Sequence, residues 1–235
     1  AHTETPSFNT WTPGPFPATV DGQGIHRALH ISGKITVTLD RLSLVNGQAE
    51  QGGNVYAENA RLTFIATSVM SGSATYGGGL YLKNCSSAID PLSPEWSGED
   101  LPSSLLLIQN NKAQYGGGLY VQGGTPALAA LYVYSNTATL NGGGLYLQGG
   151  QPTIAVGIAR HNRAAGQGGG LYMEESAARI VEMIVYSNTA AAGAGFYLKG
   201  PLTLSLDEVP LIANSYIRHN AAVGAHEDDF VRRLR

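Results

Sequence analysis

The chain is poor in cysteine and in charge. Its single cysteine, Cys85, has no partner for a disulfide within the chain. Charged residues make up 13% of the sequence, about half of the usual ~25%. The formal net charge is −3 and the basic residues are scattered, so we expect no nucleic-acid partner. No stretch approaches the ~20 apolar residues of a membrane-spanning helix, so we expect no membrane insertion within this chain.

Carboxylates are missing from the middle of the chain, because no Asp or Glu occurs between Asp100 and Glu174. Glycoside hydrolysis needs two carboxylates about 5 to 10 Å apart, and a calcium-assisted lyase needs a cluster of acidic oxygen ligands. The sequence therefore predicts no catalytic residue, no metal site and no cofactor.

Glycine is abundant instead, with 31 residues in the chain. Six times a glycine-rich turn leads into an aliphatic–Tyr–apolar triplet, and the tyrosines recur every 25 or 26 residues apart from one interval of 39. A fixed period of this length is typical of one turn of a wide parallel β-helix. We predict an all-β fold, a right-handed parallel β-helix (solenoid) of about seven coils, each rising by about 4.8 Å.

A second repeated element precedes the glycine runs. It is a short strand that ends in Asn-x-Ala, and two earlier copies carry Gly47 and Gly72 in place of the asparagine. Asn and Gly adopt the left-handed backbone conformation most readily, so this exchange predicts a positive-φ corner at the asparagine. No Lys-Ser or Lys-Thr follows the glycine runs, which excludes phosphate loops and indicates bends where stacked backbones approach closely. The asparagines are Asn111, Asn136, Asn162, Asn188 and Asn220.

Period-two alternation distinguishes the interior from the exterior. The residues on either side of each tyrosine are apolar almost throughout, whereas the residue two positions after it is always polar. The tyrosines are therefore predicted to point outward as one file beside a polar row, with Glu58–Lys83 and Glu174–Lys199 as cross-strand ion pairs. The tyrosine file is Tyr56, Tyr81, Tyr120, Tyr146, Tyr172 and Tyr197, and the polar row is Glu58, Lys83, Gln122, Gln148, Glu174 and Lys199.

Two hypotheses explain the tyrosine file. Aromatic faces beside hydrogen-bonding side chains suit pyranose rings, which makes the six tyrosines with Gln122, Gln148 and Glu174 a candidate ligand-binding site. Tyrosines about 4.8 Å apart can also stack on one another and stabilise the solenoid without any ligand. The sequence leaves both hypotheses open.

A second outward file alternates rings and guanidinium groups, at Tyr134, Arg160, Tyr186 and Arg218, which is the geometry for cation–π stacking. A mostly apolar row, which includes Tyr132, shares its outward direction. Such a patch is unusual on a lone soluble domain, so either a neighbouring segment covers it or it is a face for a partner or for self-association. The predicted interaction face is Tyr132, Tyr134, Arg160, Tyr186 and Arg218. The apolar row is Leu107, Tyr132, Ile158, Ile184 and Tyr216.

The repeat pattern also divides the chain. Residues 1–18 are expected to flank or cap the first coil, and residues 19–225 to form the β-helix. Breaks in the period predict loop insertions at about 85–102 and 205–213. The charged residues 226–235 are expected to end the apolar pattern and to keep the last coil from pairing with another molecule.

The run from Thr19 to Gly24 and the repeated Asn-x-Ala…Gly-Gly-Gly-Leu-Tyr motif resemble bacterial surface proteins with right-handed parallel β-helix repeats, over roughly residues 19–225. These are proteins of the choice-of-anchor type and, more distantly, polymorphic outer-membrane proteins. The resemblance implies an extracellular or cell-surface location. It also implies a non-enzymatic rigid spacer or adhesin-like segment with a polysaccharide or a surface protein as its partner. Because other β-helices cleave polysaccharides, a lyase or glycoside hydrolase of the pectate-lyase-like class is the alternative.

Overall fold

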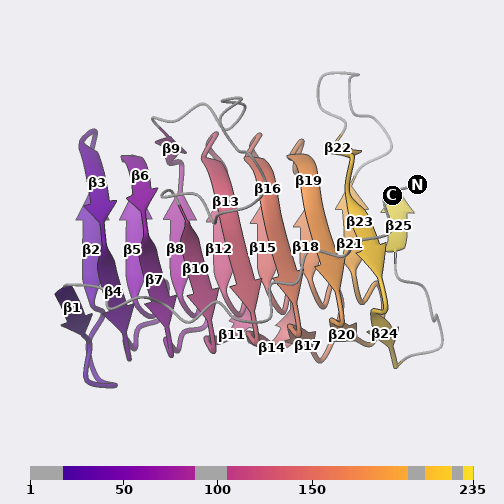
Figure 1. The fold of residues 1–235 in the computed structure, drawn as a ribbon, viewed down its shortest axis with the longest axis horizontal. Coiled ribbons are helices and arrows are strands. Elements are labelled where there is room, and N and C mark those ends of the chain that lie inside the picture. Colours follow the sequence, from indigo (N-terminus) through magenta and orange to yellow (C-terminus); the bar gives the residue numbers. More distant parts are fainter. Residues whose placement is uncertain (1–17, 88–104, 201–209, 224–229, 235) are drawn as a thin grey trace.

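A computed structural model describes residues 18–87, 105–200, 210–223 and 230–234. Within these ranges the chain is a parallel β-solenoid of about six turns, close to the predicted number of coils. Figure 1 shows the strands side by side along the rod, with β1 at one end and β25 at the other. The same ranges contain no helix, and hence no helix that could cross a membrane.

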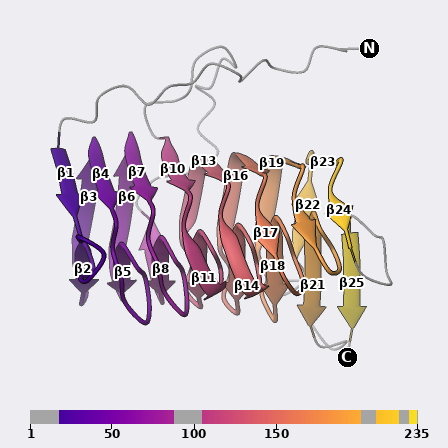
Figure 2. The ribbon, with the colours of Figure 1, turned by 90° about the horizontal axis from the view of Figure 1, so that it is seen from below.

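The described strands form parallel sheets, of which the two largest run the length of the rod and lie on opposite sides of it (Figure 2). The nine-stranded sheet contains β1 (Ala18–Asp21), β4 (Leu42–Val45), β7 (Thr67–Met70), β10 (Leu106–Gln109), β13 (Ala127–Tyr134), β16 (Thr153–Arg160), β19 (Arg179–Tyr186), β22 (Leu211–Ala213) and β23 (Tyr216–Arg218). The eight-stranded sheet contains β2 (Leu29–Ser32), β5 (Val55–Glu58), β8 (Leu80–Lys83), β12 (Leu119–Gln122), β15 (Leu145–Gln148), β18 (Leu171–Glu174), β21 (Phe196–Gly200) and β25 (Phe230–Leu234).

Two smaller sheets complete the coils. The five-stranded sheet contains β11 (Lys112–Tyr115), β14 (Thr137–Asn141), β17 (Arg163–Ala164), β20 (Thr189–Ala190) and β24 (Ala221–Ala222). The three-stranded sheet contains β3 (Thr36–Asp40), β6 (Arg61–Ile65) and β9 (Ser86–Ser87).

Equivalent residues of successive coils pair directly. Tyr120 of β12 lies between Tyr81 and Tyr146, and Ile108 of β10 lies between Val69 and Val133. Residues one repeat apart in the sequence are therefore lateral neighbours, which confirms the predicted fold class.

The interior is filled by the columns that the alternation predicted to point inward. In the nine-stranded sheet this column is completely buried from β4 to β19, and Ile217 of β23 packs half-buried against the same core. The apolar neighbours of the tyrosines face it from the eight-stranded sheet. The completely buried column is Leu44, Val69, Ile108, Val133, Ala159 and Val185.

The corners before the five-stranded sheet differ from the prediction by one residue. Positive φ occurs at the residue before each asparagine, as at Ser135 (φ 55°) and His161 (φ 53°), whereas Asn136 and Asn162 are not in this conformation. The prediction of a left-handed asparagine is therefore wrong. Asparagine occurs at this position because of its side chain and not because of its backbone freedom, since the corner turns that side chain into the interior.

There the asparagines form a hydrogen-bonded ladder along the rod. The Asn136 backbone N–H and Nδ2 both donate to Oδ1 of Asn162 at 3.0 Å, and Nδ2 also donates to the carbonyl of Ile108 at 3.0 Å. Asn162 repeats these contacts with the Asn188 side chain and the Val133 carbonyl. Each amide thus satisfies buried backbone groups of the preceding coil, which would otherwise be costly. The ladder is Asn111, Asn136, Asn162, Asn188 and Asn220.

The glycine runs make room for this ladder. The first glycine of each run has a φ of +57° to +69°, which turns the chain into the next strand. A Cβ atom on the third glycine, as at Gly118 or Gly144, would lie 3.0 Å from the side chain of the ladder asparagine. A Cβ atom on the second, as at Gly143, would lie 2.5 Å from a carbonyl oxygen of the next coil. The predicted close approach of stacked backbones is confirmed.

An asparagine of the preceding coil takes the place of one missing ladder side chain. Asn54 stands where later coils have the third glycine, and Gly72 stands where they have the ladder asparagine. The Asn54 Oδ1 atom accepts from the Gly47 N–H at 2.6 Å, and its Nδ2 atom donates to the Met70 carbonyl and to Asn111 Oδ1. The ladder therefore continues through the coil that lacks its own asparagine.

The structure contains strands in three segments that were predicted to lie outside the regular coils. β9 lies within the first predicted insertion (85–102), β22 lies within the second (205–213), and β25 pairs with β21 inside the predicted charged end (226–235). Those parts of the chain continue the coils. The predicted flank at 1–18 lies outside the described residues except for Ala18, the first residue of β1.

Candidate binding surfaces

The six tyrosines of the tyrosine file are one continuous stack on the eight-stranded sheet. Neighbouring ring centroids are 5.5, 5.2, 4.7, 4.6 and 5.3 Å apart from Tyr56 to Tyr197. Four of these five contacts are nearly parallel, with interplanar angles of 3° to 10°. The stacking hypothesis is confirmed.

The file lies outside the coil interior, as predicted, but it is not exposed to solvent. Its six side chains are only 2% to 8% exposed. Tyr76 and Tyr115 pack edge-on against Tyr120 and Tyr146, at centroid distances of 5.5 and 5.8 Å. A Cβ atom on Gly142 would lie 3.0 Å from the Cβ atom of Tyr146, so the glycine turn also lies against the file. The prediction of an exposed ring surface is wrong, because alternation gives the direction of a side chain and not what covers it.

The hydroxyl groups tie the file to the polar row. Tyr81 donates to Gln122 Oε1 at 2.7 Å and Tyr120 donates to Gln148 Oε1 at 2.8 Å. Tyr146 donates to the carboxylate of Glu174. The predicted ligand-binding groups Gln122, Gln148 and Glu174 thus accept hydrogen bonds from the chain itself.

The two ion pairs predicted in the polar row are confirmed. Lys83 lies 2.8 Å from Glu58, and Lys199 pairs with Glu174. A ligand-binding role for the file and its polar row stays a prediction. Since the ring faces are occupied by one another, only the half-exposed polar row can carry that role.

Burial of the file changes the acid–base behaviour of its phenols. It raises the pKa of Tyr81 to about 12, and it raises the pKa values of Tyr120 and Tyr146 as well. For Tyr146 the hydrogen bond to Glu174 acts in the same direction as burial. These pKa values lie above the value of about 10 of an unfolded tyrosine, so the folded state keeps protons that the unfolded chain loses.

We therefore expect the fold to lose stability as the pH rises from about 10 towards 12, and not below that range. An alkaline titration followed by tyrosinate absorbance and circular dichroism checks this. Part of the tyrosinate signal should appear only when the β-sheet signal is lost. Ionisation of all 12 tyrosines with the sheet intact would contradict the buried file.

The second surface lies on the outer face of the nine-stranded sheet. The apolar row has the predicted direction and register, but Leu107, Tyr132 and Ile158 are buried and Ile184 is half-buried. Tyr216 is 56% exposed. The row therefore presents less apolar surface to a partner than predicted, and self-association through it stays a prediction.

Beside this row, Arg160 is held among three tyrosine rings. Its guanidinium carbon lies 5.2 Å from the ring centroid of Tyr132, 5.5 Å from that of Tyr134 and 6.0 Å from that of Tyr186. Its Nη1 atom also donates to the Tyr186 hydroxyl at 3.0 Å. The cation–π stacking predicted for this file is confirmed for Arg160.

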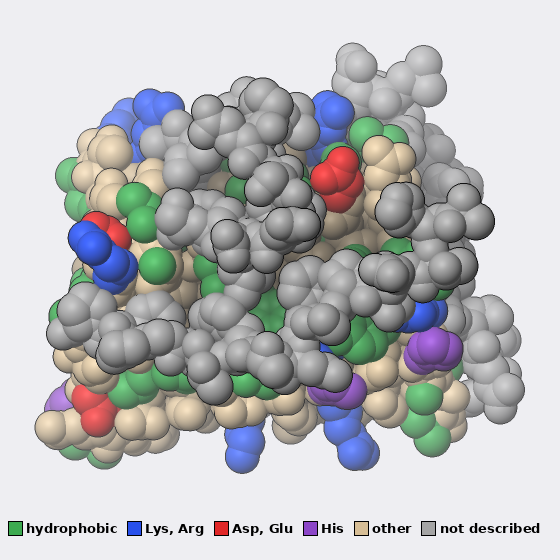
Figure 3. Space-filling model, viewed as in Figure 1, with side chains coloured by type: hydrophobic (Ala, Val, Ile, Leu, Met, Phe, Trp, Pro, Cys, Tyr) green, Lys and Arg blue, Asp and Glu red, His purple; other side chains and the backbone are tan. Residues whose placement is uncertain are grey.

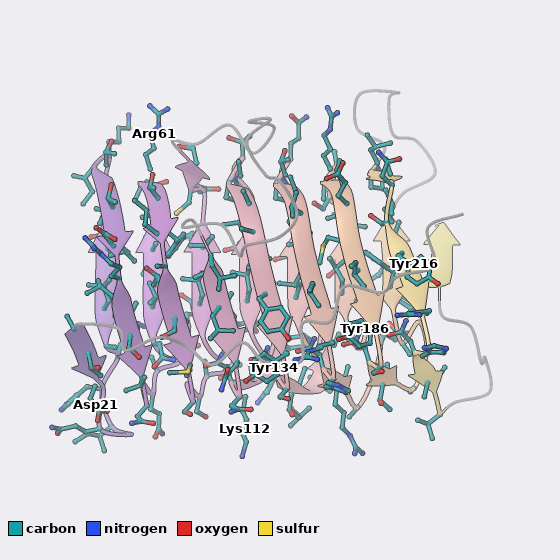
Figure 4. The ribbon with its side chains drawn as sticks, viewed as in Figure 1. Asp21, Arg61, Lys112, Tyr134, Tyr186 and Tyr216 are labelled. Atoms are coloured by element: carbon teal, nitrogen blue, oxygen red, sulfur yellow. The ribbon has the colours of Figure 1, made fainter. Side chains whose placement is uncertain are left out.

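Arg218 stacks differently from the prediction. Its guanidinium carbon lies 4.9 Å from the ring centroid of Tyr216, a residue of the apolar row. Figure 4 shows Tyr134, Tyr186 and Tyr216 spread along the same side of the rod. We call this the tyrosine–arginine surface, made of Tyr132, Tyr134, Arg160, Tyr186, Tyr216 and Arg218.

Three buried polar atoms of one file lack hydrogen-bond partners. They are Oε1 of Gln109 and the Nε atoms of Arg160 and Arg218, and the three residues occupy one register position across β10, β16 and β23. Among the described residues only Ser176 has another such atom. Buried polar groups without partners are rare and unfavourable, and three of the four such atoms in the described residues lie in this one file.

The histidines beside this surface do not form a metal site. His161 lies edge-on to Tyr186, with centroids 6.1 Å apart, and burial together with the Arg160 charge lowers its pKa. His219 takes the equivalent corner two coils later. In the part of the chain that the structure describes, no group of three His, Cys, Asp or Glu side chains could hold a metal ion.

The sequence contained signals for some residues that alternation alone missed. Tyr76 and Tyr115 each directly precede a glycine run, and that shared position relates them to the turn that covers the file.

Comparisons with protein-family models, with curated proteins and with solved structures find no match for this chain. The repeat architecture is therefore established by the fold alone.

Proposed function

We propose that the chain is a rigid, non-enzymatic module of a bacterial cell-surface protein that binds a polysaccharide along its tyrosine–arginine surface. The observation that carries this proposal is the stacking of Arg160 among three tyrosine rings, with Tyr216 exposed further along the same sheet. Aromatic rings and hydrogen-bonding groups fixed on a flat sheet suit the alternating apolar faces and hydroxyl edges of sugars. The location and the choice-of-anchor-like identity belong to the same proposal and rest on the repeat motifs.

The coil architecture supports the role of a rigid support. Ladders of backbone hydrogen bonds, the asparagine ladder and the tyrosine file all run in the direction of the rod. Side chains on one face are therefore held at fixed intervals without loop movement.

A polysaccharide-degrading enzyme is the alternative, and the acidic residues of the polar row do not favour it. Glu58 and Glu174 each face a lysine and a tyrosine hydroxyl. They stand four coils apart, about 19 Å at one strand spacing per coil, beyond the ~10 Å that glycoside hydrolysis allows. These carboxylates are suited to structural ion pairs.

A glycan array followed by calorimetry tests the proposed function. We expect Tyr216→Ala to weaken binding about tenfold, or about 1.4 kcal/mol, because an exposed ring loses its stacking contact with the sugar. Leu140→Ala is the matched control, since Leu140 is 41% exposed on β14 of another sheet. Absence of any glycan ligand would contradict the proposal, and release of shortened sugars would favour the enzyme.

A further inference from the structure

We infer that the tyrosine–arginine surface selects a linear acidic glycan in which a carboxylate recurs at every second sugar. The inference rests on the proposed glycan-binding function and adds the charge and the repeat of the ligand. Three observations carry it: the spacing of the two arginines, the lack of an ion pair at either of them among the described residues, and the charge around them.

The spacing comes from the register of the coils. Tyr134, Arg160, Tyr186 and Arg218 are successive partners across β13, β16, β19 and β23. The two arginines are therefore two strand spacings apart, about 9.6 Å, with one ring between them. A disaccharide unit of an extended glycan spans a similar length, so one acid per disaccharide would meet each guanidinium in turn.

The guanidinium groups have no acidic partner in the part of the chain that the structure describes. Arg160 forms hydrogen bonds with the side chains of Tyr186 and Tyr132, and its buried Nε atom has no partner. The Nε atom of Arg218 is likewise without a partner, and within the described ranges neither arginine forms an ion pair. Stacking on rings fixes the plane of each guanidinium, which leaves its edge for a carboxylate.

The surroundings favour a negative ligand. His161 and His219, which follow the two arginines directly at the corners, add no negative charge there. In the lower right of Figure 3 the described atoms show basic and histidine side chains and no acidic one. The acidic residue of β19 is Glu182, an exposed residue at the bend four positions before Tyr186. Within the described ranges, a carboxylate at Arg160 or Arg218 would therefore be attracted without competition from an acidic side chain that pairs with either arginine.

A glycan fits this surface better than an acidic peptide does. Peptides that bind sheets add a strand at an exposed edge, whereas these residues lie on the face of the sheet between paired strands. Gln109 lies in the same file, and its unpartnered Oε1 atom is an acceptor for a sugar hydroxyl.

Calorimetry with four probes of matched length tests the inference. The probes are a hyaluronate oligosaccharide with a carboxylate on every second sugar, its carboxyl-reduced neutral form, an oligogalacturonate with a carboxylate on every sugar, and poly-glutamate. We expect the hyaluronate to bind most tightly, at least tenfold better than its reduced form, and to weaken as salt is added. Arg160→Ala and Arg218→Ala should each reduce this binding about tenfold, while Arg163→Ala, an exposed arginine on β17, should not.

Each other outcome overturns the inference in a different way. Equal binding of the neutral form would contradict an acidic ligand and leave the proposed function intact. Tighter binding of oligogalacturonate would contradict a ligand with a carboxylate on every second sugar, and equal binding of poly-glutamate would contradict a glycan ligand. Binding of no probe, and of no glycan on the array, would remove the proposed function as well. Arg160→Lys, which keeps the charge and the fold but not the planar stack, should lose most of the affinity.

Discussion

Replacing Asn136 by alanine is expected to lower the free energy of unfolding by about 4 kcal/mol, since two buried backbone groups each lose a partner worth about 1 to 3 kcal/mol. These groups are the Asn111 N–H and the Ile108 carbonyl, which bond to the Asn136 side chain. Chemical denaturation followed by circular dichroism measures the loss.

The same coil offers the control for this prediction. Gln114 is exposed on β11, and Gln114→Ala should change the free energy of unfolding by no more than about 0.5 kcal/mol. Asn220→Ala, at the half-exposed end of the ladder, should have a smaller effect than Asn136→Ala. A loss below about 1 kcal/mol for Asn136→Ala would mean that the ladder is not a main source of stability.

The second large effect is expected at the tyrosine file. Tyr146→Ala should lower the free energy of unfolding by about 3 to 5 kcal/mol, as for other large rings removed from a packed interior. Tyr146 is 4% exposed and stacks between Tyr120 and Tyr172. Thermal and chemical unfolding of the variant give the measurement.

Two further variants separate the ring from its hydroxyl. Tyr146→Phe keeps the stack and loses only the bond to Glu174, so we expect a loss of about 1.5 to 3 kcal/mol. Tyr216→Ala, at an exposed ring, should leave the free energy of unfolding nearly unchanged. If Tyr146→Ala were as mild as Tyr216→Ala, the file would not be buried.

The fold could be predicted because the sequence repeats its physical pattern in every coil. The apolar neighbours of each tyrosine and the column from Leu44 to Val185 point inward in each turn, and their alternation needs no knowledge of tertiary contacts. The ion pair of Glu58 with Lys83 followed from the same register. Residues one period apart became neighbours as expected.

What could not be predicted depends on contacts between elements. Alternation placed the tyrosines outside the coil, but the cover supplied by Tyr76, Tyr115 and the glycine turns depends on how the turn folds back. The exchange of Asn and Gly at the corner suggested backbone freedom, whereas the buried amide of Asn54, which replaces a missing side chain at Gly72, shows that hydrogen bonding decides it. The stacking of Arg218 on Tyr216 depends on a choice of rotamer that sequence spacing does not specify.

Tyrosine nitration with peptide mapping tests most directly whether the tyrosine file is buried while Tyr134, Tyr186 and Tyr216 of the tyrosine–arginine surface are accessible. Brief treatment of the folded protein with tetranitromethane should modify Tyr216 first and Tyr134 and Tyr186 next, and should spare Tyr81, which is 2% exposed, and the rest of its file. Nitration of the file as fast as that of Tyr216, with the fold intact, would contradict the burial of the file.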